Sequence, residues 1–123
     1  MNNFVDIINR SKVVLTEGGM LERIRRNVHV ELDPFIAHSG LIYDEKGRDI
    51  LKHIYTEYIG IGTKYNLPFM SMAPTWRANP ERLKRAGYSR YRDINTDCVN
   101  FLKEIRKAYS KRLQEIFIGG MMA

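Results

Sequence analysis

The chain contains a single cysteine, Cys98, and this scarcity excludes several classes of protein. One thiol forms no internal disulfide and supplies no multi-thiolate metal site. Long apolar runs are also missing, because no stretch approaches the roughly 18 residues that a membrane-spanning helix needs. The first residues, Met1–Asp6, carry neither the basic start nor the apolar region of a signal peptide. These features predict a cytoplasmic protein that does not act on or in a membrane.

The sequence also lacks the short motifs that mark many catalytic sites. It has no Gly-x-Gly-x-x-Gly pattern, no phosphate-binding loop and no Ser–His or Cys–His nucleophile motif. The three histidines, His29, His38 and His53, share no metal-ligand spacing, which favours structural or solvent-facing roles. Cys98 lies on the apolar stripe of a predicted helix, which favours a buried, inert thiol over a reactive one.

The charge balance is basic, and it leaves two interpretations open. Twenty Lys and Arg residues stand against fourteen Asp and Glu residues, for a net charge of +6 in 123 residues. The positive charge gathers at 77–92 and at 103–112. The second cluster alternates with apolar residues at helical spacing, which favours the solvated side of an amphipathic helix. A small basic α/β module that binds nucleic acid or an acidic protein remains the alternative, although no recognised nucleic-acid motif supports it.

Helical and extended patterns alternate along what we interpret as a single domain, residues 1–123. Strands are expected at Lys12–Thr16, Phe69–Ala73 and Glu115–Ile118, and helices at Met20–Arg26, Glu45–Asn66, Pro80–Gly87 and from Asp93 or Asn95 to about Lys111. Asn79 before Pro80 is a strong helix-capping signal. Residues 27–44 show no sustained period and are expected to form a long connection. Helical crossovers join parallel strands, so the fold class is α/β.

Two strand ends carry residues suited to ligand binding. Glu17, Gly18 and Gly19 follow the first strand, where a carboxylate beside bare backbone can hold a ligand ammonium. The other interpretation is a turn in which Glu17 faces water and the glycines satisfy backbone dihedral demands. Thr75 and Trp76 follow the second strand and place a hydroxyl and an indole at the same edge of the sheet.

The segments at these strand ends resemble, in order and spacing, those of the homocysteine S-methyltransferases. The resemblance runs from about Ser11 to the end of the chain, and it rests on the segments Val14–Arg23, Asp33–Tyr43, Ala73–Leu83, Arg92–Asn95 and Phe117–Gly120. It implies a (β/α)8 barrel that moves a methyl group from a donor such as S-methylmethionine, betaine or methylfolate to homocysteine, giving methionine. It also implies that Glu17 receives the homocysteine ammonium, that Gly18 and Gly19 give backbone access, and that Thr75 and Trp76 line the pocket.

The chain departs from this family in length and in its cysteines. A (β/α)8 barrel takes about 250 residues, and only three strands are expected here. The family's zinc ion is held by three cysteines late in the barrel, and Cys98 matches none of them. We therefore expect the N-terminal portion of such a barrel, which binds no zinc and is inactive alone. Unpaired strand edges and apolar faces predict a homo-oligomer. The methyltransferase interpretation expects no nucleic acid partner.

Overall fold

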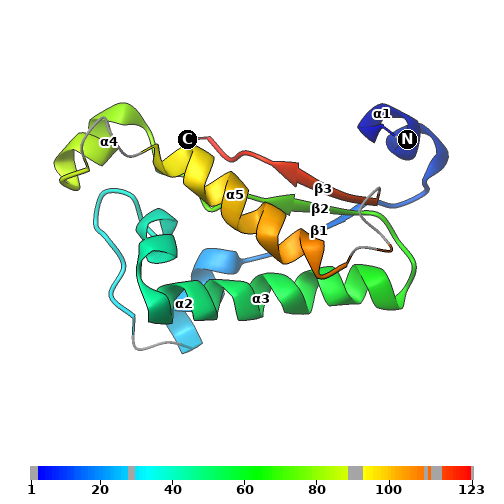
Figure 1. Ribbon diagram of the computed structural model, residues 1–123, viewed down its shortest axis with the longest axis horizontal. Coiled ribbons are helices and arrows are strands. Elements are labelled where there is room, and N and C mark those ends of the chain that lie inside the picture. The colour runs from blue at the N-terminus through cyan, green and yellow to red at the C-terminus, as the bar shows by residue number, and fades with distance from the viewer. Residues whose placement is uncertain (1–2, 28–29, 89–92, 110, 112–114, 123) are drawn as a thin grey trace.

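The computed structural model describes residues 3–27, 30–88, 93–109, 111 and 115–122 (Figure 1). After a first short helix, groups of helices separate the three strands. In order they are α1 (Phe4–Arg10), β1 (Leu15–Thr16), α2 (Met20–Asn27), the 3-10 helix η1 (Ser39–Tyr43), α3 (Glu45–Lys64), β2 (Phe69–Met72), α4 (Pro80–Arg85), α5 (Ile94–Lys107) and β3 (Ile116–Gly119).

The three strands form one parallel sheet in the order β1-β2-β3. Leu15 pairs with Phe69, and Phe69 pairs in turn with Ile116, so the three strands are aligned across the sheet. The predicted α/β class and the parallel direction of all three strands are confirmed. Because all three strands run parallel, the carboxyl ends of β1, β2 and β3 lie at one edge of the sheet.

Helices α3 and α5 pack side by side against one face of the sheet (Figure 1). Strand β2 alternates accordingly, because Phe69 and Ser71 are buried whereas Met70 and Met72 are only half-buried. Gly62 of α3 lies against the Phe69 side chain, so the buried side of β2 faces α3. The core is therefore a sheet–helix layer, and the opposite face of the sheet carries the half-buried Met70, Met72 and Phe117.

Local capping signals fix the helix ends as the sequence predicts. The Asn79 side chain accepts a hydrogen bond from the Arg82 N–H at 2.9 Å, and Asp93 accepts one from Thr96 N–H at 3.0 Å. Helix α3 ends before Asn66, which has a φ of 52°, and α4 is followed by Gly87 with a φ of 84°. These left-handed residues terminate their helices at the expected places.

Other boundaries differ from the sequence interpretation. The first strand is short and not buried, since only Leu15 and Thr16 pair and Val13 is 48% exposed. The β-branched Val13 and Val14 favour a strand, but neither is paired with β2 in the described sheet. The connection after α2 contains η1, and α5 ends at Lys107 rather than near Lys111, while 110 and 112–114 lie outside the described residues.

Helix α1 was not expected from the sequence. Asn3 caps it by accepting a hydrogen bond from Asp6 N–H at 2.8 Å. Ile7 is buried, and the Phe4 ring meets the Phe117 ring of β3 edge-on at 5.1 Å. This short helix is therefore held by tertiary packing against the sheet. None of the helices formed by described residues is both long and apolar enough to cross a bilayer.

Candidate functional site at the carboxyl ends of the strands

Glu17 bridges the carboxyl ends of two neighbouring strands. It follows β1 directly, and its Oε1 accepts a hydrogen bond from the Met72 N–H of β2 at 2.5 Å. Its other oxygen, Oε2, is buried and has no hydrogen-bond partner among the described residues. Burial raises the pKa of the Glu17 carboxyl to about 7, against the lowering effect of the Met72 hydrogen bond. The alternative in which Glu17 merely faces water is therefore wrong.

Two tyrosines of α3 hold the same edge of the sheet. The Tyr55 hydroxyl donates to the Met72 carbonyl at 2.7 Å, and the Tyr58 hydroxyl donates to the Gly18 carbonyl. Burial raises the pKa of Tyr55 well above its usual value, and the nearby Glu17 carboxylate adds to the rise. Both tyrosines recur with the apolar residues of α3 at helical spacing, and the sequence analysis assigned no role to their hydroxyls. Their helical spacing on one face was the available signal.

The two glycines after Glu17 lie in open space rather than in a tightly packed turn. A Cβ at Gly18 or Gly19 would meet nothing within 4 Å, so neither glycine is required by crowding. Gly19 has a φ of 58°, and its carbonyl accepts the Arg23 N–H of α2 at 2.9 Å. A dihedral demand therefore explains Gly19. The predicted role of the glycines in giving a ligand access to the backbone stays a prediction.

Thr75 and Trp76 both follow β2, but their side chains contact different parts of the protein. The buried Thr75 hydroxyl donates to the Met121 carbonyl at 2.9 Å and accepts from the Met121 N–H at 3.1 Å. This residue therefore ties the segment after β3 to the segment after β2. Trp76 is half-buried, and the Arg77 guanidinium lies 4.1 Å from its ring centre. The pocket-lining roles expected for both toward homocysteine stay predictions.

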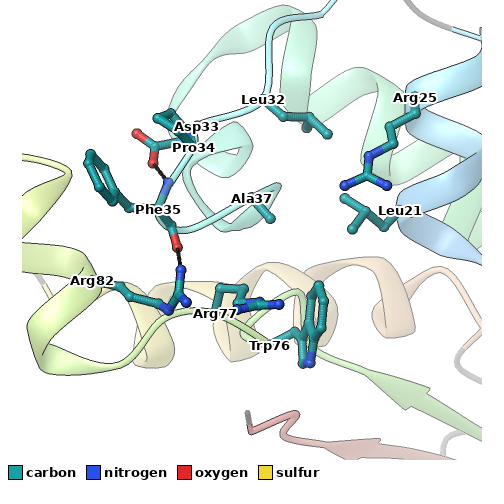
Figure 2. A pocket seen from close by; sticks show the side chains of 10 residues that line it. All are labelled: Leu21, Arg25, Leu32, Asp33, Pro34, Phe35, Ala37, Trp76, Arg77 and Arg82. Carbon is teal, nitrogen blue, oxygen red and sulfur yellow. Dashed lines mark hydrogen bonds between the residues drawn. The ribbon is translucent and has the colours of Figure 1, made fainter.

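A cavity of about 390 Å³ opens beside Trp76 (Figure 2). Leu21 and Arg25 of α2 form one wall, the segment from Leu32 to Phe35 with Ala37 forms another, and Trp76, Arg77 and Arg82 complete it. Glu17 is not among its lining residues. The long connection after α2 thus contributes a wall to a cavity at the carboxyl edge of the sheet.

The described residues do not fit a zinc site. No group of three or more His, Cys, Asp or Glu side chains within the described ranges is placed to hold a metal ion. Cys98 is fully buried in α5, and its Sγ donates to the Ser39 carbonyl at 3.7 Å. Burial raises the pKa of its thiol to about 12, as expected for an inert cysteine. His53 is exposed and pairs with Glu57, while His29 lies outside the described residues.

His38 is buried, and its Nδ1 has no partner among the residues that the structure describes. Burial lowers the pKa of His38 to about 4 from its usual 6.5. The unfolded chain therefore binds the extra proton first as the pH falls, and the folded state loses stability between pH 6.5 and 4.

Relative to H38Q, the wild-type free energy of unfolding should fall by about 3 kcal/mol between pH 7 and pH 4. Urea unfolding at both pH values measures this, and parallel pH profiles would contradict it.

Comparison with known proteins adds no family assignment. No family model, no curated protein and no solved structure matches the chain. The functional argument therefore rests on the residues and the geometry described above.

Proposed function

We propose that this chain provides the first three parallel strands, with their crossover helices, of a homocysteine S-methyltransferase barrel, in which Glu17 binds the ammonium group of homocysteine. The observation that carries the proposal is the Glu17 Oε2 atom, which is buried beside the carboxyl ends of β1 and β2 without a described partner. A buried carboxylate oxygen without a partner is costly. An ammonium donor at that position removes the cost.

The strand arrangement supports the barrel part of the proposal. In a (β/α)8 barrel the strands follow one another in chain order, with the helices on the outer face. The order β1-β2-β3, with α3 and α5 on one face, has this form. A doubly wound sheet instead reverses its strand order at a switch point, and β1, β2 and β3 show no reversal. Active sites of barrels lie at the carboxyl ends of the strands, where Glu17 stands.

The Glu17 carboxyl changes its protonation state near neutral pH, and a bound cation favours its ionised form. With a pKa of about 7, its carboxyl is about half protonated at neutral pH in the free chain. An ammonium donating to Oε2 stabilises the ionised form and lowers the pKa of Glu17. Homocysteine affinity should therefore rise as the pH increases through 7, until the amino group itself loses its proton. The Met72 N–H keeps the carboxyl in position by donating to Oε1, and Tyr55 holds Met72 by donating to its carbonyl.

The reaction implied is a methyl transfer between a donor and a thiolate. The bond between the homocysteine sulfur and the methyl carbon forms as the bond from that carbon to the donor breaks, which gives methionine and the demethylated donor. The described residues supply binding of the amino acid in this proposal. They do not fit a zinc site, so no thiol activation is assigned to them.

The test is calorimetric titration of the 123-residue chain with L-homocysteine in a reducing buffer at pH 8. We expect saturable binding with a Kd of about 1–10 mM, and binding at least about 10-fold weaker in E17Q, because the ion pair is lost. E22Q removes a carboxylate that pairs with Arg25 on the exposed face of α2, and it should bind like wild type. Equal affinity of wild type and E17Q, or no binding to wild type, would overturn the proposal.

We also propose that the chain associates with itself. In the described sheet β1 and β3 each pair on one side only, and Met70, Met72 and Phe117 are half-buried on the face away from α3 and α5. Open edges and apolar faces favour association. Sedimentation at micromolar concentration should show a dimer or a larger species. A monomer throughout that range would contradict this expectation.

A further inference from the structure

We infer that the cavity beside Trp76 binds a small organic anion, a carboxylate or a phosphate monoester, whose charge is held by Arg77. The inference goes beyond the proposed function, because Glu17 does not line this cavity. It rests on the charge of the lining, on the way Arg77 is held, and on the place and size of the cavity.

The lining has an excess of positive charge. The lining holds three guanidinium groups, those of Arg25, Arg77 and Arg82, and a single carboxylate, that of Asp33 (Figure 2). Asp33 is engaged in its own turn, since its Oδ1 accepts hydrogen bonds from Phe35 N–H at 2.7 Å and Ile36 N–H at 3.0 Å. Its charge is therefore partly satisfied by backbone donors, and the cavity stays electropositive.

The three arginines are not equally available. Arg82 donates to the Phe35 carbonyl at 3.0 Å and so holds the cavity wall. Arg25 pairs with Glu22 at 2.8 Å, but both side chains are more than half exposed, so this pair is weak and can rearrange. Arg77 makes no side-chain hydrogen bond to any described residue. It is the guanidinium with donors to offer a ligand.

Arg77 is also restrained by a neighbouring ring. Its guanidinium carbon lies 4.1 Å from the centre of the Trp76 ring (Figure 2), which is a cation–π contact. This contact uses none of the guanidinium's hydrogen-bond capacity toward an oxygen acceptor. The planar fork of a guanidinium matches the two oxygens of a carboxylate or a phosphate. Because Arg77 is half-buried, part of the ordering cost is already met in the free chain.

The place and size of the cavity suit a small molecule with an apolar body. A volume of about 390 Å³ lies within the range of small-ligand sites. Leu21 and Leu32 give apolar walls, and the cavity lies between the segments that follow β1 and β2, where ligands bind in parallel α/β folds. The geometry therefore matches an anionic group on Arg77 with an apolar body against Leu21 and Leu32.

The experiment titrates the chain with phenyl phosphate, benzoate and inorganic phosphate at constant ionic strength, by calorimetry and by tryptophan fluorescence. Trp76 is the only tryptophan, so its emission reports on this cavity. We expect saturable binding of phenyl phosphate or benzoate with a matching change in Trp76 emission. Affinity should fall at least about 10-fold in R77Q and about 3-fold or more in R77K, which keeps the charge but loses the fork. The two organic anions then tell whether the site takes phosphate, carboxylate or both.

Two control variants locate the effect. R85Q removes the same charge from α4, where Arg85 pairs with Glu81 and does not line the cavity, and it should bind within about 2-fold of wild type. E17Q should also leave anion binding unchanged, because Glu17 does not line the cavity. Anion binding at the cavity and homocysteine binding at Glu17 can therefore fail independently of each other. Absence of saturable binding, an equal loss in R77Q and R85Q, or heat without a Trp76 response would overturn the inference. Inorganic phosphate binding as tightly as phenyl phosphate would overturn the contact with an apolar body.

Discussion

Replacing Glu17 with glutamine should raise the free energy of unfolding at pH 8 by about 2 kcal/mol while it weakens homocysteine binding. The folded chain keeps the Glu17 carboxyl buried with a pKa of about 7, whereas the unfolded chain ionises it near 4.5. That difference corresponds to at most about 3 kcal/mol. Glu17 is only partly buried, so solvent screening reduces the figure to about 2 kcal/mol. Glutamine keeps an acceptor for the Met72 N–H and carries no charge.

The sign of the pH dependence follows from proton linkage. Between pH 4.5 and 7 the folded state binds more protons at Glu17 than the unfolded state, so this residue makes stability fall as the pH rises through that range. E17Q should therefore match wild type near pH 4 and exceed it at pH 8. His38 acts in the opposite direction, but it is present in both proteins and cancels in the comparison.

Urea unfolding of wild type and E17Q at pH 4, 6 and 8 measures this effect. The matched control is E22Q on the exposed side of α2, which should change stability by less than about 0.5 kcal/mol at every pH. An E17Q protein less stable than wild type at pH 8 would contradict the burial of an unpaired carboxylate oxygen. Gained stability together with lost binding would show that Glu17 is retained for ligand binding.

The same Gly-to-Ala change should have opposite effects at two places in α3. A Cβ at Gly47 would lie 2.6 Å from the Leu41 carbonyl oxygen and 2.9 Å from the Leu41 Cβ. The obstacle is mainly backbone, which moves only if η1 and α3 separate. A Cβ at Gly60 meets nothing within 4 Å. Alanine in a helix gains about 0.5–1 kcal/mol over glycine.

We therefore expect G60A to raise the free energy of unfolding by about 0.5–1 kcal/mol and G47A to lower it by about 2 kcal/mol. The Gly47 N–H also donates a hydrogen bond to the side chain of Asp44, the helix cap, at 2.7 Å, so a shift of Gly47 disturbs the start of α3. Urea denaturation of both variants at pH 7 gives the comparison. Two changes of the same sign would mean that η1 and α3 do not pack as described.

Features with local causes were predictable from the sequence. Asn79 with Pro80, and Asp93 before α5, carry their capping signal within a few residues. The apolar face of α3 follows from its helical period, and the buried Cys98 follows from its place on the stripe of α5. The parallel α/β class follows from the alternation of elements.

Features that depend on distant contacts were not predictable in this way. Helix α1 is held by Phe4 against Phe117 of β3, and the pairing of β1 with β2 is limited to Leu15 and Thr16. The contact between Glu17 and Met72 depends on the register of two strands separated by 55 positions. The cavity joins Arg25 of α2 with Arg77 after β2, and no local pattern relates these residues.

The most direct test of the account is an NMR titration of the Glu17 side-chain carboxyl carbon with pH, with and without saturating L-homocysteine. The account predicts a pKa near 7 in the free chain and a value below about 6 when the homocysteine ammonium is bound. The analogue 4-mercaptobutanoate, which lacks the amino group, should leave the value near 7. A Glu17 pKa that homocysteine does not change would contradict the account.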